Sequence, residues 1–157
     1  LRSMLNQYAV DIMPGEYSFR EHTTGGPPDK TYEESCFLER FRQMLVTEEA
    51  DTLWLARATP RAWLEQGKPL AVKNAPTHFG TLAYEIVSDA DHGKIAAVVE
   101  LPSRNPPKTA LLRLRHPKAL PIKSVEVNGK PWTEFDKDKE VVRLTGLTGK
   151  VAVRVGY

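Results

Sequence analysis

The sequence predicts a mainly β fold: an antiparallel β-sandwich of about seven or eight strands, preceded by two α-helices and a long loop. Three observations lead to this prediction. Apolar residues recur at helical spacing over residues 1–50, the hydrophobic period changes to two after Asp51, and turn residues then recur roughly every ten to twelve positions. We therefore expect a helical segment over 1–50, the end of a larger helical domain, and a sandwich domain over 51–157.

The helical segment contains two stretches with an apolar face. The first is predicted to end before Pro14, and its face carries Leu1, Leu5, Tyr8 and Ile12. The second is predicted to begin at Thr31, because Thr31 and Glu34 have the spacing of a capping box. Its apolar stripe consists of Phe37, Phe41, Met44 and Leu45. The start of the chain resembles the middle of a helix, so we expect the C-terminal part of a larger protein.

Strand-like segments follow one another from residue 52 to the end of the chain. They read TLWLAR, LAVKNA, LAYEIVS, KIAAVVELP, ALLRLRH, IKSVEVNGK, EVVRLTGL and KVAVRVGY. The connections contain His92-Gly93 and Asn128-Gly129. Asn-Gly adopts positive φ at little cost, which predicts a tight type I′ hairpin at Asn128. Arg113 and Arg115 alternate with leucines, so we expect one face of that strand to meet water.

Composition excludes several classes of function. The chain has 157 residues, a net charge of +2 with both signs interspersed, and one cysteine. No segment approaches the roughly 18 apolar residues of a membrane span, so we expect no membrane partner. The small, dispersed charge gives little reason to expect nucleic acid. A single cysteine forms no internal disulfide and leaves the cellular compartment undetermined.

The loop over 16–30 holds the candidate carbohydrate contacts. Two carboxylates, a guanidinium, an imidazole and an aromatic ring lie close together at Glu16, Tyr17, Arg20, Glu21 and His22. Sugar sites use such groups, because carboxylates bind hydroxyls and aromatic faces stack on sugar rings. The simpler interpretation is an exposed ion pair beside aromatic anchors. One loop does not supply two carboxylates at the separation that glycoside hydrolysis requires, so no catalytic residue is assigned.

No metal or cofactor site is predicted. The four histidines lack the spacing of a metal motif. His92 lies between Asp89 and Gly93 in a segment that fits a hairpin turn better than a metal loop. His78 fits a packed, hydrogen-bonded role, and Cys36, beside the apolar stripe, fits packing rather than nucleophilic catalysis.

One segment resembles a known family. Leu53, Leu55, Ala58, Pro60, Trp63 and Gly67, followed by THFGTLAYEI and the later VEVNGKPW, resemble the C-terminal region of large bacterial glycosidases with an (α/α)6 toroid, the alpha-L-rhamnosidase-like proteins. In that family the last toroid helices lead into a closing β-sandwich. Arg57 departs from the family pattern, which usually has a Leu-Pro step before this alanine, so the subfamily and the substrate stay open.

The resemblance implies a non-catalytic C-terminal module that packs on an upstream helical toroid of the same parent chain and stabilises it. The catalytic carboxylates of the family lie upstream, so none is carried onto this sequence. A secreted or periplasmic location would follow if the parent degrades polysaccharide. The structural seam between helices and sandwich would contain Trp54, Arg57, Pro60 and Trp63. We expect Trp63 to fill the seam, with Arg57 and Arg61 binding loop carbonyls or acids across it.

Two alternatives belong to other functional classes. An independent carbohydrate-binding module would expose aromatic side chains to stack on sugar, with Trp54, Trp63, Trp132 and Tyr84 as the candidates. An intact small enzyme would require the carboxylates of Glu16, Glu21 and Glu33 or Glu34 to converge on one pocket. Exposed aromatic residues on the sandwich would favour the first alternative, and buried tryptophans would favour the structural module.

Overall fold

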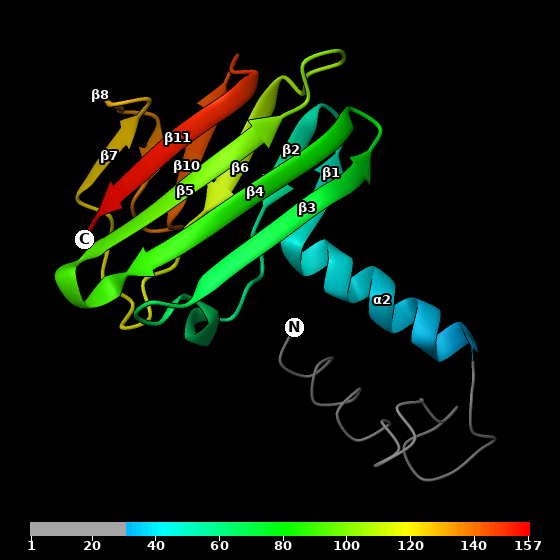
Figure 1. The fold of residues 1–157 in the computed structure, drawn as a ribbon, viewed down its shortest axis with the longest axis horizontal. Helices are drawn as coiled ribbons and strands as arrows, with labels where there is room; N and C mark the ends of the chain where they lie inside the picture. Colours follow the sequence, from blue (N-terminus) through cyan, green and yellow to red (C-terminus); the bar gives the residue numbers. More distant parts are fainter. Residues whose placement is uncertain (1–30) are drawn as a thin grey trace, which may run out of the picture. The chain divides into compact units, whose positions relative to one another are not determined.

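A computed structural model describes residues 31–157 of the chain (Figure 1). The chain forms two compact units, Leu1–Met44 and Leu45–Tyr157. In the first unit the described element is the helix α2 (Thr31–Leu45), which begins at the residue indicated by the capping-box spacing. Its predicted apolar stripe is only partly buried, because Phe41 is 39% exposed. The predicted first helix and the 16–30 loop lie outside the described residues.

The second unit is mainly β, as predicted, with its described strands in two sheets. The sheet named here the β1 sheet has the order β1 (Val46–Glu49), β2 (Thr52–Leu55), β6 (Thr109–Arg113), β10 (Val141–Thr145), β9 (Phe135–Asp136). The β3 sheet has the order β3 (Pro69–Thr77), β4 (Gly80–Asp89), β5 (Lys94–Leu101), β11 (Gly149–Gly156), β7 (Ser124–Val127), β8 (Lys130–Pro131).

The structure differs from the sequence prediction in two details of the sheets. The described part contains eleven strands rather than seven or eight, because β1, β8 and β9 are only 4, 2 and 2 residues long. The sheets are also not wholly antiparallel, since β2 pairs with β6 in parallel. The parallel pair arises because the chain leaves the β1 sheet after β2 and returns to it only after completing β3, β4 and β5.

The core lies between the two sheets and follows the period of two in the sequence. Along β5 every second side chain is buried, and β11 repeats the pattern. The buried residues of both sheets form one apolar cluster, with Ile86 and Val99 from the β3 sheet and Leu112 and Leu144 from the β1 sheet. Full burial of one such aliphatic side chain contributes roughly 1.5–3 kcal/mol before chain entropy is subtracted. The alternation therefore determines which face of each strand points inward.

The turns confirm the local chemistry that the sequence indicated. Asn128 and Gly129 have φ of 50° and 75°, and the register pairs Val127 with Lys130 across them. This is the two-residue type I′ hairpin that Asn-Gly predicts. The Asn128 side chain also accepts a hydrogen bond from the Ala152 amide at 2.9 Å. Between β4 and β5 the chain turns through the 3-10 helix η2 (Ala90–His92), and Gly93 has φ of 66°.

None of the helices among the described residues combines the length and the apolar character that crossing a membrane requires.

Gly80 provides a test of backbone constraint at the β3–β4 turn. Its φ is +123°, and a Cβ there would lie 3.3 Å from Cβ of Pro102. An alanine would have to adopt an unfavourable backbone conformation and also displace Pro102. We expect Gly80→Ala to lower the free energy of unfolding by about 2 kcal/mol. Urea denaturation followed by fluorescence measures the change.

Gly149→Ala is the matched control for this prediction. Gly149 also has positive φ, +68°, but nothing lies within 4 Å of its added Cβ. We expect Gly149→Ala to lower the free energy of unfolding by only about 1 kcal/mol, because only the backbone conformation is unfavourable. Equal losses in the two variants would contradict the crowding at Pro102.

Candidate functional site

The segment that resembles the glycosidase family connects the two sheets. It runs from the end of β2 to the start of β3 and contains the 3-10 helix η1 (Arg61–Leu64). Pro60, with φ of −59°, precedes this helix, and its carbonyl accepts a hydrogen bond from the Trp63 amide at 3.1 Å. Leu64 is the buried side chain of η1, whereas Trp63 is half-buried. Leu64 is therefore the side chain of η1 that packs in the core of the sandwich.

The end of β4 fixes the second half of this crossover. The Ser88 hydroxyl donates a hydrogen bond to the Leu64 carbonyl at 2.6 Å, and the Gly67 amide donates to the Ser88 carbonyl at 2.9 Å. Ser88 is 2% exposed. Each buried polar atom named here thus has a partner, as burial requires. Positive φ at Gly67, 72°, lets the chain turn into β3.

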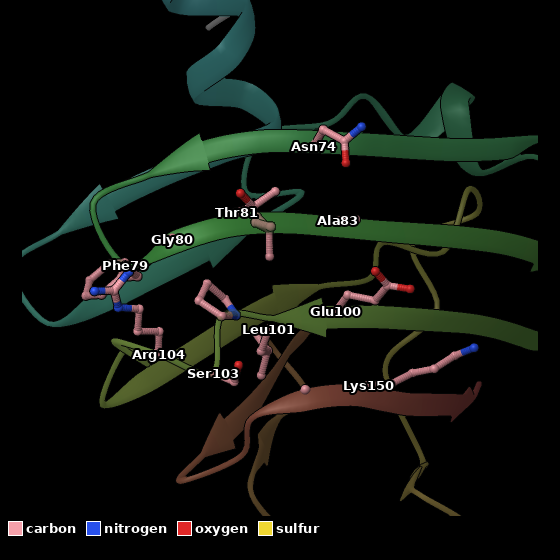
Figure 2. A pocket seen from close by; sticks show the side chains of 13 residues that line it. Asn74, Phe79, Gly80, Thr81, Ala83, Glu100, Leu101, Ser103, Arg104 and Lys150 are labelled. Atoms are coloured by element: carbon pink, nitrogen blue, oxygen red, sulfur yellow. The ribbon is translucent and has the colours of Figure 1, made fainter.

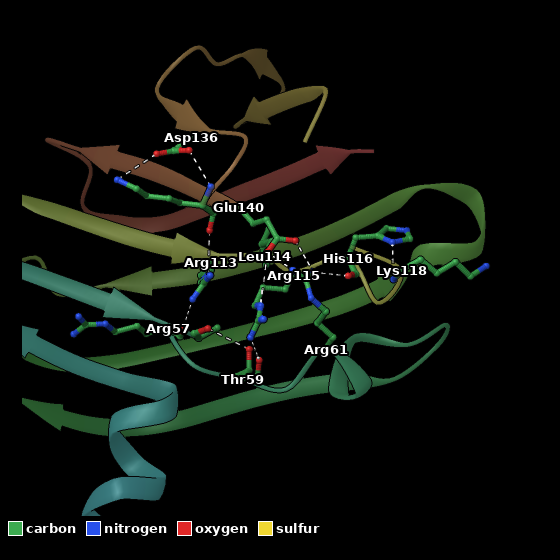
Figure 3. A network of polar contacts seen from close by, with 12 residues as sticks. Arg57, Thr59, Arg61, Arg113, Leu114, Arg115, His116, Lys118, Asp136 and Glu140 are labelled. Carbon is green, nitrogen blue, oxygen red and sulfur yellow. Dashed lines mark hydrogen bonds and ion pairs between the residues drawn. The ribbon is translucent and has the colours of Figure 1, made fainter. Parts of the chain in front are cut away.

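An ion pair between the half-buried Arg61 and the buried Glu140 ties the crossover to the far part of the chain (Figure 3). Arg61 donates from Nη1 and Nη2 to the two carboxylate oxygens of Glu140, at 2.6 and 2.7 Å. Arg61 Nη1 also donates to the carbonyl of His116 at 2.6 Å. Glu140 is 5% exposed and has φ of 58°, which is unusual for a residue with a side chain. Two parallel charge-assisted bonds of this kind fix geometry as well as charge.

Two further arginines extend this network over the crossover. Arg113 donates from Nη1 to the carbonyl of Arg57 at 3.0 Å and from Nε to that of Lys139 at 3.1 Å. Arg115 Nη1 donates to the Thr59 carbonyl at 3.1 Å. Figure 3 shows Arg61 and Arg115 near the carboxylate of Glu140, whereas Arg113 reaches backbone carbonyls. The side chains of β6 and its extension thus hold the backbone of the crossover.

Arg115 is the most constrained cation of the network. Burial lowers the pKa of its guanidinium, and the neighbouring charges of Arg61 and Arg113 lower it further. Its Nε lies 3.7 Å from Oε2 of Glu140, which is too far for a hydrogen bond. Among the described residues this Nε is the buried side-chain atom that lacks a hydrogen-bond partner.

His116 is buried in this network in a defined tautomer. Its Nδ1 accepts a hydrogen bond from the Lys118 amide at 3.1 Å, so the proton of the neutral ring is on Nε2. Nε2 then donates to the Ala90 carbonyl at 3.1 Å. The ring is 1% exposed and lies 4.9 Å from the ring of Tyr157. Sequence reasoning missed this role, because a histidine after an alternating strand resembles an exposed turn residue.

The network is suited to holding structure rather than to moving protons. A general acid or base needs a free oxygen or nitrogen that can reach a substrate. Both oxygens of Glu140 already accept from Arg61, and both nitrogens of His116 are bonded to the backbone. Over residues 31–157, no group of three or more His, Cys, Asp or Glu side chains could hold a metal ion.

The tryptophans proposed as sugar platforms are engaged by their own chain. Trp54 Nε1 donates to Glu49 at 3.1 Å, and the guanidinium of Arg57, ion-paired with Glu49, lies 4.8 Å from the Trp54 ring centroid. Trp132 Nε1 donates to the Arg143 carbonyl at 3.0 Å. A ring covered by a cation does not offer that face to a sugar.

Tyr84 is 3% exposed, and its hydroxyl donates to the Leu45 carbonyl at 3.0 Å. Burial raises the pKa of Tyr84. Within Leu45–Tyr157 no tryptophan or tyrosine is exposed. The predicted loop residues Glu16, Tyr17, Arg20, Glu21 and His22 lie outside the described residues.

The histidines near the ends of β4 form pairs with carboxylates. His78 Nδ1 lies 2.7 Å from Oε2 of Glu48, which also accepts from the His78 amide. His92 Nδ1 lies 2.6 Å from Oδ1 of Asp89. This hydrogen bond raises the pKa of His92 and lowers that of Asp89, whose carboxylate Gln66 also contacts. The arrangement fits the turn that the sequence indicated at His92.

A shallow hollow opens on the exposed face of the β3 sheet (Figure 2). Its volume is about 560 Å³. The polar side chains that line it include those of Asn74, Thr81, Glu100, Arg104 and Lys150. These residues come from four strands and a loop, and sequence reasoning named none of them.

Comparison with known proteins finds a distantly similar solved structure and no matching family model. No protein-family model matches the chain, and no curated protein matches it. A solved structure described as a glycoside hydrolase is similar, with a TM-score of 0.43 and 16% sequence identity. The match covers 77% of this chain and 19% of that protein, so the chain spans about a fifth of its length. Similarity at this level does not assign the chain to a family.

Removal of Arg61 tests the buried pair. Arg61→Ala leaves the carboxylate of Glu140 buried without its cation, so we expect the free energy of unfolding to fall by about 3 kcal/mol. Arg57→Ala, which breaks the exposed pair with Glu49, should cost no more than about 1 kcal/mol. The double variant Arg61→Met with Glu140→Met should be more stable than Arg61→Ala, because it buries no unpaired charge. Equal losses for Arg61→Ala and Arg57→Ala would contradict a buried pair.

The pair of His92 and Asp89 predicts a pH window. The raised pKa of His92 means that its contribution to stability is complete below the ordinary value of 6.5 and is lost as pH rises through the folded pKa. The lowered pKa of Asp89 means that its contribution is present above 3.8 and is lost as pH falls through the folded pKa. An NMR titration should show a lower His92 pKa in Asp89→Asn than in the wild type. An unchanged His92 pKa would rule out the pair in solution.

Proposed function

We propose that the chain is a non-catalytic structural module of a carbohydrate-active, glycoside hydrolase-like protein, packing on an upstream helical domain and stabilising it. The observation that carries this proposal is the place of the crossover. Pro60, Trp63 and Gly67, which resemble the glycosidase family, lie in the turn that connects the two sheets. The neighbouring Arg61 is held by Glu140 across the sandwich. The resembling segment thus serves the architecture of the sandwich.

The chemistry of the described residues supports a non-catalytic role. Glycoside hydrolysis requires two carboxyl groups placed on either side of the scissile bond. The deeply buried carboxylate, Glu140, accepts hydrogen bonds from Arg61 at both oxygens. The half-buried Glu48 is paired with His78, and the exposed Glu49 is paired with Arg57. This distribution of charge favours scaffolding over acid and base catalysis.

The same contacts disfavour a binding module that stacks sugars on aromatic rings. Such a module presents flat aromatic faces to solvent. In the sandwich Trp54 lies under Arg57, and Tyr84 is buried in the core. The structural module is therefore the better supported of the two alternatives.

The proposal is tested on the 157-residue chain and on its parent protein. We expect the chain to release no nitrophenol above blank from a panel of aryl glycosides. We also expect the reading frame upstream of Leu1 to encode a helical domain whose melting temperature falls when residues 45–157 are deleted. Hydrolysis that disappears in Glu140→Gln would overturn the non-catalytic role. A parent without a helical domain, or with an unchanged melting temperature, would overturn the packing role.

A further inference from the structure

The hollow on the β3 sheet has a floor of small residues and backbone. Gly80, Ala83 and Gly149 lie in this floor, beneath a space of about 560 Å³. A second hollow of about 400 Å³ shares Asn74, Ala83, Glu100 and Lys150 with it, so the two are continuous along the sheet. The size is in the range that small ligands occupy in proteins.

The walls of this hollow are set by the backbone. The β3–β4 register shifts between Val72 and Ala75, and within this bulge Asn74 has φ of 52°. A bulge redirects a side chain out of the regular ladder, and bulges are frequent beside binding sites. On the other side Gly80 approaches Pro102 so closely that a Cβ would lie 3.3 Å from it. The shape is therefore built into the strands and does not depend on a mobile side chain.

Five polar side chains of the hollow form no hydrogen bond or ion pair with other described residues. Lys150 is directly opposite Glu100 in the β5–β11 register, yet these side chains form no ion pair with each other. Thr81, Arg104 and Asn74 also have no side-chain partner among the described residues. Glu48, Glu49 and Glu140, by contrast, are all paired elsewhere on the sandwich. The hollow thus offers both hydrogen-bond donors and acceptors to a ligand.

The arrangement of charge narrows the class of ligand. Figure 2 shows Lys150 beside Glu100 toward one end of the hollow and Arg104 toward the other, with Thr81 on the neighbouring strand β4. Two cations at separate places suit a ligand that carries more than one anionic group, and a guanidinium binds a carboxylate with two bonds. The hydroxyl of Thr81 and the carboxylate of Glu100 suit hydroxyl groups between these anions.

We propose that this hollow binds a short acidic oligosaccharide, whose units carry both carboxylates and hydroxyls, as in a chain of uronic acids. A neutral glycan would leave Arg104 without a counter-charge, since Glu100 lies beside Lys150 and not beside Arg104. A nucleic acid would need an aromatic platform for its bases and a larger excess of positive charge. The aromatic ring at the site, Phe79, is only 6% exposed. This site is separate from the crossover, so it adds a binding role to the structural one proposed above.

The test is an NMR titration of the 157-residue chain with tetragalacturonate, and with cellotetraose as a neutral probe. We expect saturable shifts at the amides of Thr81, Glu100 and Lys150 with the acidic probe only. Affinity should rise as salt is lowered, because charges drive the contact. Lys150→Gln and Arg104→Gln should each weaken binding about tenfold, since each removes one charge-assisted contact.

Lys94→Gln is the matched control, because Lys94 lies on the same face of β5 at its other end. It should leave the affinity unchanged. Absence of saturable shifts with tetragalacturonate, equal weakening by Lys94→Gln, or equal binding of cellotetraose would each overturn the proposal. None of these results affects the structural role, which is judged by hydrolysis and by the melting temperature of the parent.

Discussion

The ion pair of Arg61 and Glu140 is the constraint around which the sandwich is arranged. These residues are 79 positions apart in the chain, and their two hydrogen bonds join the crossover between the sheets to the start of β10. Arg113 and Arg115 add bonds to the crossover carbonyls on the same side. Because the carboxylate of Glu140 is shielded from water, removing Arg61 would leave a buried charge without its cation. The path of the crossover between the sheets therefore depends on the position of Glu140 next to β10.

Regular periodicity made the general architecture predictable. β4, β5 and β11 are long, and each alternates buried and exposed residues, so the sequence alone indicates a sheet with one covered face. Asn128-Gly129 likewise specifies its own hairpin, since its conformation is a local property of the two residues. Strands of two residues, such as β8 and β9, carry no period and could not be foreseen. The parallel pairing of β2 with β6 depends on a distant return of the chain, which local patterns do not encode.

The functional residues were less predictable, because their partners are distant in the sequence and local patterns do not encode such contacts. Arg61 could be expected to bind an acid, but its partner Glu140 lies in a charged turn, DKDKE, that resembles an exposed surface. The hollow combines residues of β3, β4, β5 and β11, and its shape depends on a bulge at Asn74. Nothing in the local sequence distinguishes these uncommitted side chains from ordinary surface charges. Sites that arise from the meeting of separate strands become visible only once the register is known.

The order of the strands also determines whether the sandwich can be divided. The chain builds β1 and β2 in one sheet, β3 to β5 in the other, and then alternates through β6, β7 with β8, and β9 with β10, before ending in β11. β11 lies inside its sheet, between β5 and β7. Any cut along Leu45–Tyr157 therefore separates strands that share a sheet, and every contiguous fragment that contains one complete sheet also contains strands of the other. In this topology the two sheets are not modules that could be exchanged or inherited separately; the sandwich is the smallest unit that a gene rearrangement could move intact.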